Sequence, residues 1–358
     1  MKQRFNVRRA VCLMAVCSAV SPLAKAQSSV TLYGVADIGI EVISHVPTGA
    51  PGGGAATQVD MFSGGLMFPR VGVTGREDLS GGWAAVFKLE TYYTINNGAL
   101  WRNIQYYGGS WVGVNSPYGQ LQVGRNPGLF YDFQFYYDPG LVARYSLSPF
   151  DAAFAGRPNN SVKYISSAGP FTLSALYSFG YTGTDGVNGQ VPGVYKVGKE
   201  ESLRVNYAGS VLAVGAAYDH QNGTTVTTQS DVNDRGIVAA SLTFGPSRTI
   251  VGFRYLRSTV GEAIAINKIV WAGEVYTITP ALTTCASYYR TFNAGSNSAI
   301  SDYVAVLVDY SLSKQTDVYF NAGYVRNRGG ATLGLVPAQL VGANVAQTGA
   351  MVGIRQRF

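Results

Sequence analysis

Apolar and polar residues alternate along much of this 358-residue chain with a period of two. The pattern is clearest over residues 171–179, where apolar or aromatic residues fill every odd position. Those positions are Phe171, Leu173, Ala175, Tyr177 and Phe179. The alternation recurs over residues 30–41, 304–310, 318–324 and 352–358. Because successive side chains of a strand point to opposite faces, we expect strands with one apolar and one polar face.

Seven tight turns and eight longer polar or glycine-rich stretches separate the alternating segments. The turns span residues 78–82, 116–119, 168–170, 208–210, 245–247, 279–282 and 313–315. The longer stretches centre near residues 52, 97, 137, 185, 225, 261, 296 and 334. Together they join sixteen strands, and an even strand number with short turns on one side is typical of outer-membrane barrels. The sequence therefore predicts an all-β fold, a 16-stranded antiparallel transmembrane β-barrel with short periplasmic turns and long extracellular loops.

The predicted strand number has a consequence for function. An eight-stranded barrel is filled by its own side chains, whereas about 16 to 18 strands enclose an aqueous lumen. A pore is therefore expected, with apolar side chains facing lipid. In the first strand we expect Val30, Leu32 and Ile40 to face outward, and Asp37 and Glu41 to face inward. A soluble all-β sandwich repeat is the alternative fold.

The amino-terminal residues have the pattern of a secretory signal peptide. Residues 1–9 carry four basic side chains, residues 10–20 are largely apolar, and Ala24-Lys25-Ala26 is a small-x-small cleavage site. We expect residues 1–26 to be a cleaved signal and residues 27–358 to form the barrel domain. A buried amino-terminal helix is the alternative.

Removal of this segment changes the charge balance. The full chain has 27 Lys and Arg against 20 Asp and Glu, and residues 1–26 hold five of the basic residues and no acidic one. The remaining 22 basic and 20 acidic residues nearly balance, so the basic composition does not indicate nucleic-acid binding. Of the three cysteines only Cys285 remains, which excludes an internal disulfide.

The composition also indicates a compartment. Charged residues make up only 13% of the chain, which contains 44 Gly and 24 Tyr. After the signal, no segment approaches the roughly 18 uninterrupted apolar residues of a membrane helix. An exported, aromatic-rich chain without membrane helices favours the bacterial outer membrane, where closed barrels pair their backbone groups internally.

Six segments resemble those of a known family. They are residues 28–37 (SSVTLYGVAD), 69–82 (PRVGVTGREDLSGG), 121–126 (LQVGRN), 160–164 (NSVKY), 309–317 (DYSLSKQTD) and 352–358 (VGIRQRF). Together they are similar to the Gram-negative general porins, especially the trimeric porins of beta-proteobacteria. Gln356, Gly108 and Gly109 depart from the family pattern, and Lys163 replaces its usual Arg. The resemblance implies a homotrimer, surrounded by outer-membrane lipid and lipopolysaccharide, that lets ions and small hydrophilic solutes diffuse passively through a water-filled channel.

The resemblance also gives a role to the aromatic stretch between Pro127 and Arg157. So long a loop is either functional or disordered, and this one is too aromatic for disorder. By resemblance it folds into the barrel as the third loop and narrows the lumen. Its acidic residues, expected on one side of the constriction, are Asp132, Asp138 and Asp151, and its basic residues are Arg144 and Arg157. A surface loop that packs on another subunit or loop is the alternative.

Inward strand positions offer the opposite, basic side of the constriction. These positions are Arg70, Lys88, Lys163, Arg204 and Arg254. Of these, Arg70 and Lys163 match constriction positions of the family. Charges of opposite sign across a narrow aqueous gap influence which ions pass. Because the candidate basic residues outnumber the acidic residues of the loop, we expect a weak anion preference.

Other functions have less support in the sequence. His45 and His220 are the only histidines, and neither has the spacing of a catalytic triad or a metal site. We therefore expect no enzyme activity, no cofactor, no metal and no nucleic-acid partner. One alternative function is a substrate-selective channel for a sugar or an aromatic acid, with Tyr136 and Tyr137 as an aromatic track. Another is a structural or adhesive barrel with a blocked lumen. The terminal Phe358 resembles the signal that the outer-membrane barrel assembly machinery reads.

Overall fold

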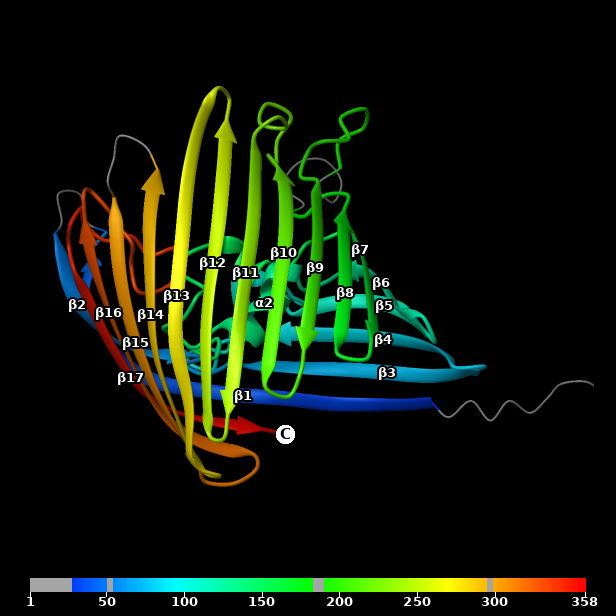
Figure 1. Ribbon diagram of the computed structural model, residues 1–358, viewed down its shortest axis with the longest axis horizontal. Coiled ribbons are helices and arrows are strands. Elements are labelled where there is room, and N and C mark those ends of the chain that lie inside the picture. The colour runs from blue at the N-terminus through cyan, green and yellow to red at the C-terminus, as the bar shows by residue number, and fades with distance from the viewer. Residues whose placement is uncertain (1–27, 50–53, 183–189, 295–298) are drawn as a thin grey trace, which may run out of the picture.

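The computed structural model describes residues 28–49, 54–182, 190–294 and 299–358. Within them the fold is one antiparallel sheet of seventeen strands that closes on itself (Figure 1). The predicted signal peptide, residues 1–26, lies outside the described residues. In the part of the chain that is described, no helix has the length and hydropathy needed to cross a membrane.

The first nine strands are β1 (Ser28–Pro47), β2 (Ala55–Ser63), β3 (Arg70–Ser80), β4 (Trp83–Tyr92), β5 (Gly109–Ser116), β6 (Gly119–Arg125), β7 (Ser161–Ala168), β8 (Phe171–Ser178) and β9 (Glu200–Ala208). The remaining strands are β10 (Leu212–Asn222), β11 (Val232–Phe244), β12 (Ser247–Val260), β13 (Ala263–Thr279), β14 (Leu282–Ala294), β15 (Ile300–Ser311), β16 (Thr316–Arg328) and β17 (Gln347–Arg357). The helical elements are η1 (Trp101–Asn103), α2 (Leu129–Tyr137) and η2 (Ala152–Ala155).

Strand β1 closes the barrel because it is paired along both edges. On one edge it pairs with β17, in the register Ile38↔Ile354. On the other edge its first half pairs with β3 and its second half with β2. We therefore describe β2 and β3 as two halves of one barrel strand, interrupted at residues 64–69. The seventeen segments make up the predicted closed barrel of sixteen strands with one additional segment.

The side chains alternate across the barrel wall as the sequence predicts. On the outer face Val30 is 69% exposed and Leu32 is 64% exposed, whereas Asp37 on the inner face is fully buried. In β8, Phe171 and Leu173 lie exposed on the outside, and Ser174 is buried on the inside. A continuous apolar surface outside and polar groups inside are the arrangement that a lipid-facing barrel needs.

The short connections gather at one end of the barrel and the longer ones at the other (Figure 1). The connection at Gly261 differs from the expected polar loop. Strands β12 and β13 remain paired as far as Val260 and Ala263, so only two residues form the turn. Gly261 has a φ of 57° there, a left-handed conformation that glycine adopts without steric cost. The two strands thus form an extended hairpin.

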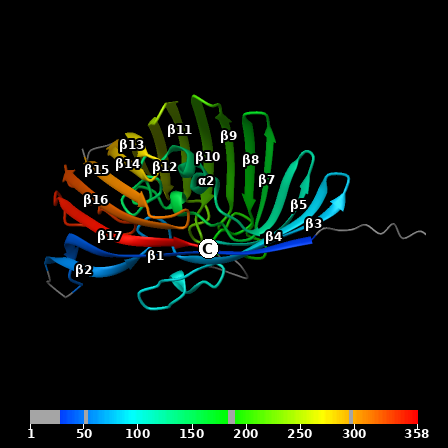
Figure 2. The ribbon, with the colours of Figure 1, turned by 90° about the horizontal axis from the view of Figure 1, so that it is seen from below.

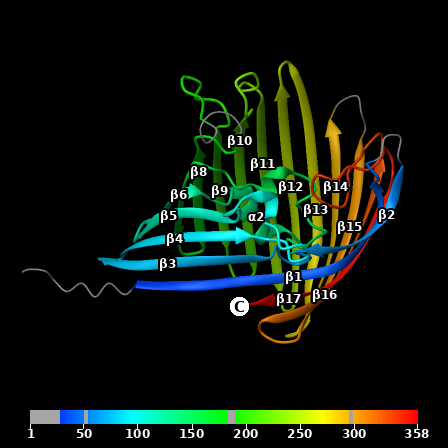
Figure 3. The same ribbon diagram turned by 180° about the vertical axis from the view of Figure 1, so that it is seen from behind.

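The third loop, residues 126–160, lies inside the barrel, as Figures 2 and 3 show. It contains helix α2, which packs on strands β8 to β12. Beneath the loop the inward faces of the strands are apolar rather than polar. These buried inward residues are Ile250, Ile269, Trp271, Tyr289 and Tyr303. They form a hydrophobic core with loop residues such as Phe133 and Phe154, because the loop removes this part of the wall from water.

Candidate functional site

The third loop is fixed where helix α2 ends. The carboxylate of Asp138 accepts hydrogen bonds from the backbone N–H groups of Gly140 and Val142, both at 3.0 Å. It also accepts a hydrogen bond from the Tyr289 hydroxyl, at 2.7 Å, on strand β14. Burial raises the pKa of Asp138, against the opposing effect of these hydrogen bonds. Asp138, expected in the constriction, therefore lies within the protein and joins the loop to the wall.

A second carboxylate of the loop also binds the wall. Both carboxylate oxygens of Asp151 accept from Nε of Arg235 at 3.1 Å, and Nε of Arg254 lies 3.3 Å from Oδ2. Both arginines come from inward positions, on β11 and β12. Burial alone raises the pKa of Asp151, but the two guanidinium groups outweigh burial and hold it below its usual value. This ion-pair network joins η2 to the barrel wall.

The remaining loop carboxylate, Asp132, pairs with Lys163 of strand β7. Nζ of Lys163 lies 2.5 Å from a carboxylate oxygen of Asp132 and 2.9 Å from the backbone oxygen of Pro127. Each of the three acidic residues of the loop is thus engaged with the wall or with the loop backbone. Asp132 and Asp151 thus face basic groups of the wall, as the sequence predicts, whereas the cavity described next is lined by arginines of both the loop and the wall.

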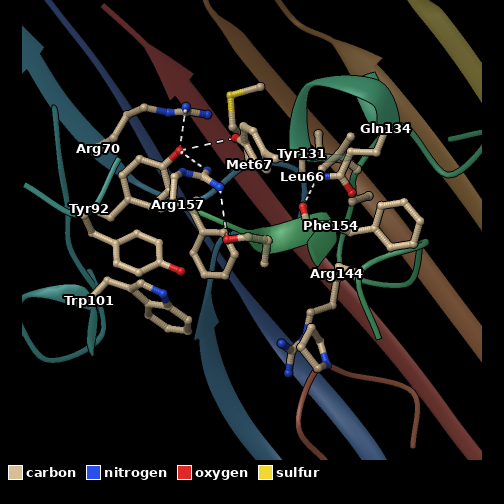
Figure 4. Close-up of a pocket in the computed structure, with 18 of the residues that line it drawn as sticks. Leu66, Met67, Arg70, Tyr92, Trp101, Tyr131, Gln134, Arg144, Phe154 and Arg157 are labelled. Carbon is tan, nitrogen blue, oxygen red and sulfur yellow. Dashed lines mark hydrogen bonds between the residues drawn. The ribbon is translucent and has the colours of Figure 1, made fainter. Parts of the chain in front are cut away.

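A cavity of about 320 Å³ lies between the third loop and the interruption of the second barrel strand (Figure 4). Four arginines line it, and they are Arg70, Arg102, Arg144 and Arg157. Eight aromatic residues line it as well, and they are Phe62, Phe68, Tyr92, Trp101, Tyr107, Tyr131, Phe135 and Phe154. None of the described residues that line this cavity is acidic. The volume suits a small solute.

Two of the arginines meet at one hydroxyl group. Nη1 of Arg70 lies 3.1 Å from the hydroxyl oxygen of Tyr92, and Nη2 of Arg157 lies 3.2 Å from the same atom. The guanidinium of Arg157 also stacks on the ring of Tyr131, 3.4 Å from the ring centroid. In Figure 4 these side chains lie together on one side of the cavity. A single phenol oxygen thus holds two like charges close to each other.

The countercharges around these arginines are unequal. Glu90 lies 3.7 Å from Arg70 and 3.1 Å from Lys88, so one carboxylate serves two cations. Arg144 is neutralised by Glu41, which accepts two hydrogen bonds of 2.9 Å from it. Among the described residues, no carboxylate lies within 4.0 Å of Arg157, although the residue is only 7% exposed. The cavity wall therefore carries excess positive charge.

The opposite wall of the cavity is formed by the chain between β2 and β3, which turns into the barrel. The carboxylate of Asp37 accepts hydrogen bonds from the backbone N–H groups of Gly65, Leu66 and Met67, at 3.0, 2.9 and 2.8 Å. The backbone N–H of Arg144 donates to the oxygen of Gly65 at 2.8 Å, which links this turn to the third loop. Residues of both segments are thereby brought to one cavity.

The expected constriction residues are distributed unevenly around this site. Of the basic residues predicted on the wall, Arg70 lines the cavity, and Lys88 lies behind it against Glu90. Lys163 and Arg254 form ion pairs with the third loop. Arg204 is buried beside the ring of Tyr136, with its guanidinium carbon 5.4 Å from the ring centroid. The terminal residue, Phe358, pairs through its backbone with Gly34 of β1 at 2.9 and 3.1 Å.

The expectations for the site did not assign a role in the cavity to Arg157, Arg144 or Arg102. Arg144 and Arg157 were visible as the basic residues of an aromatic loop, which was the available signal. The placement of Arg144 depends on Glu41, and that of Arg157 beside Arg70 depends on Tyr92, and both partners are distant in the sequence. Among the described residues, no group of His, Cys, Asp and Glu side chains is arranged to hold a metal ion.

A closed barrel with an apolar outer face, a loop folded into its interior and a charged internal cavity defines a diffusion channel of the outer membrane. The sequence profile of the Gram-negative porins matches residues 11–330, and the chain belongs to this family. The family resemblance predicted from the sequence is thus confirmed. The chain is an outer-membrane porin that allows passive diffusion of small solutes.

Known relatives extend over nearly the whole chain. It is 25% identical to outer membrane porin protein 32 of Delftia acidovorans over 370 residues, which cover 98% of this chain and 100% of that protein. The solved structure of an anion-selective porin from Comamonas acidovorans has a TM-score of 0.76 at 21% identity, covering 93% of this chain and 100% of that one. The trimer form of in-vitro folded OmpT of Vibrio cholerae has a TM-score of 0.67 at 18% identity, covering 92% and 99%. The two solved structures support the barrel fold.

Proposed function

We propose that this porin favours anions over cations. The observation that carries the proposal is the unequal use of charge by the third loop. Its carboxylates are engaged by Lys163, by Arg235 with Arg254, and by the loop backbone. Its arginines Arg144 and Arg157 line the cavity instead. An excess of positive charge near a narrow passage lowers the free energy of anions there. The similarity to a porin described as anion-selective is in accord with this.

The test is the reversal potential of the purified protein in a planar bilayer under a KCl gradient. We expect the sign that corresponds to chloride passing more readily than potassium. The substitution Arg157→Gln should reduce the anion preference, because it removes a positive charge that has no carboxylate within 4.0 Å among the described residues. The matched control is Arg76→Gln on the same strand as Arg70, since Arg76 lies exposed beside Asp78 at 2.7 Å. Cation preference of the unmodified protein would contradict the proposal.

We propose an open channel without enzyme activity. The relatives are porins, and the cavity has arginines and aromatic rings rather than a nucleophile with a base. A large, ohmic single-channel conductance supports an open porin, and its absence would favour a structural or adhesive barrel.

We infer that the mature chain spans residues 27–358 and assembles as a homotrimer. The pattern of residues 1–26 supports cleavage, and a similar solved structure is described as a trimer form. The mass of the protein isolated from outer membranes tests the first inference. The mobility of unheated protein in detergent gels, compared with heated protein, tests the second.

A basic surface on the outside of the barrel supports contact with lipopolysaccharide. Lys268, Arg290, Arg326 and Arg328 point outward near the loop end of β13, β14 and β16, with Asp302 between two of them in register. Tyr288 and Tyr324 lie in the next outward row toward the middle of the wall, as expected for an aromatic girdle. Phosphate groups of an anionic outer-leaflet lipid would lie opposite these cations. Replacing Arg290 and Arg326 by Gln should lower the lipopolysaccharide that copurifies.

A further inference from the structure

We propose that the arginine-lined cavity is a binding site for small aromatic monocarboxylates, which cross the channel through it. This inference rests on the proposed anion preference and names the solute class. The cavity lies inside the barrel between the third loop, the inward turn before β3, and residues of the loop that follows β4. A ligand there would meet the guanidinium groups of Arg70 and Arg157 at one end and aromatic rings along its length (Figure 4).

The carboxylate end of the site is formed by Arg70 and Arg157. Both donate to the Tyr92 hydroxyl, and the Nε atoms of both are buried without a hydrogen-bond partner among the described residues. Arg157 is more than nine-tenths buried, and no carboxylate in the described part of the chain lies within 4.0 Å of it. A buried charge without a countercharge is costly, and an arginine donates well to a carboxylate in a paired geometry. A bound carboxylate would supply the missing countercharge.

The cavity offers this countercharge site at one end only, because Arg102 lies against the ring of Tyr107 as Arg157 does, with guanidinium carbons 5.9 and 5.7 Å from the ring centroid. At the other end, both donating nitrogens of Arg144 are already engaged by Glu41, and its guanidinium stacks on Phe62 at 3.4 Å from the ring centroid. At this end the second carboxylate of a dianionic ligand would lie near the carboxylate of Glu41, and the two negative charges would repel each other. The charge pattern therefore favours a monoanion over an aliphatic dicarboxylate of the same length.

The remaining lining favours a flat ring. Phe68 packs against Trp101 with ring centroids 4.5 Å apart and against Tyr92 at 6.1 Å. The ring of Tyr131 lies under Arg157, and burial raises the pKa of its hydroxyl, so this residue stays neutral. Aromatic pairs gain energy beyond the area they bury, which a saturated ring of similar size does not. A volume of about 320 Å³ accommodates one ring with a short acidic substituent.

The experiment uses benzoate as the probe and measures the concentration that half-blocks the chloride current through the trimer in a planar bilayer. Cyclohexanecarboxylate has the same charge and nearly the same size without aromaticity, and acetate has the charge alone. We expect benzoate to block at roughly five- to tenfold lower concentration than cyclohexanecarboxylate, the factor that aromatic contacts supply. Equal block by the two acids would overturn the proposal.

Two variants separate the charged end from the aromatic wall. Arg157→Gln should raise the half-blocking concentration of benzoate about tenfold, because a charge-assisted contact is lost. Phe68→Leu should remove the preference for benzoate over cyclohexanecarboxylate, because it removes a ring from the cavity lining. Trp101→Leu, in a loop outside the sheet, gives the same test if Phe68→Leu fails to assemble. If these ring variants keep the preference for benzoate over cyclohexanecarboxylate, the aromatic site is refuted. If the unmodified protein shows no anion preference in KCl but benzoate still blocks it selectively, only the more general proposal of anion preference is refuted.

Discussion

Asp138 illustrates how single side chains hold the third loop in an unfavourable shape. The two residues that follow Gly140 have positive φ angles, 53° for Leu141 and 60° for Val142. Such a conformation is uncommon for any residue with a side chain and is particularly strained for a β-branched one. Hydrogen bonds from Gly140 and Val142 to Asp138 help to maintain it. Both strained residues line the cavity, so the strain supports the shape of the site.

Asp151 makes the attachment of the loop dependent on pH. Its pKa in the folded protein is lower than in an unfolded chain because of Arg235 and Arg254. Folding therefore favours the ionised form, and this contribution to stability is complete above the usual Asp pKa of about 3.9 and is lost as the pH falls below it. We expect a steady single-channel current from pH 7 to about pH 5. Below about pH 4 we expect the current to fluctuate as the third loop loses this attachment to the wall.

Asp151→Asn should produce those fluctuations already at pH 7. The substitution leaves Arg254, which is fully buried, without its carboxylate, at an expected loss of about 3 kcal/mol in the free energy of unfolding. The matched control is Asp78→Asn, an exposed carboxylate paired with Arg76 outside the barrel interior. Identical pH profiles for Asp151→Asn and the unmodified channel would refute this role.

The interrupted second strand is the element that gives the cavity its outer wall. A continuous strand would pair with β1 along its whole length and leave no inward turn. The turn begins at Gly64, whose φ is 95°, and the next residue, Gly65, packs directly under the ring of Tyr319. The hydroxyl of Tyr319 donates to Asp37 at 2.6 Å, and the same carboxylate caps the turn. The shape of the turn therefore depends on Asp37 of β1 and Tyr319 of β16, which contact each other and Gly65.

Gly65→Ala tests this arrangement. An added Cβ would lie 2.2 Å from the hydroxyl oxygen of Tyr319, so the turn or the tyrosine must move and the bond to Asp37 is strained. We expect a loss of about 2 kcal/mol in urea-induced unfolding and an altered single-channel conductance. Gly54→Ala is the matched control, because a Cβ there meets no atom within 4 Å. If both variants behave alike, the close packing at Gly65 is unimportant.

The alternation of side chains was sufficient to predict most of the strands, because lipid on one side imposes it residue by residue. It did not predict the interruption at residues 64–69, since the turn depends on Asp37 and Tyr319, which are remote in sequence. It also did not predict the apolar inward face at Ile269 and Trp271, which the third loop covers. For the site, the loop and Arg70 were foreseeable. Which loop charges face the cavity was not, because neighbours such as Glu41 and Arg235 decide it.

At the scale of the whole molecule, closure depends on the joining of the two ends of the described chain. Strand β17 pairs with β1, and the last residue continues this pairing, since Phe358 and Gly34 exchange two backbone hydrogen bonds. The ring of Phe358 lies over Gly34, where an added Cβ would come within 2.2 Å of it. The ring is otherwise 55% exposed on the outside of the barrel. A barrel without this seam has two open edges, which cannot remain unpaired in lipid.

Deletion of Phe358 should therefore impair assembly in two ways. It removes the two hydrogen bonds at the end of the seam, and it removes the aromatic terminus proposed to be read by the assembly machinery. The measurement is the amount of heat-modifiable protein in isolated outer membranes, compared with folding of the same chain from urea into detergent. Phe358→Ala retains the backbone pairing and loses only the ring, so it separates the two contributions. If the ring acts as a recognition signal, Phe358→Ala will fold in detergent and accumulate poorly in cells. If the deleted chain reaches the membrane in normal amounts, the terminus has neither role.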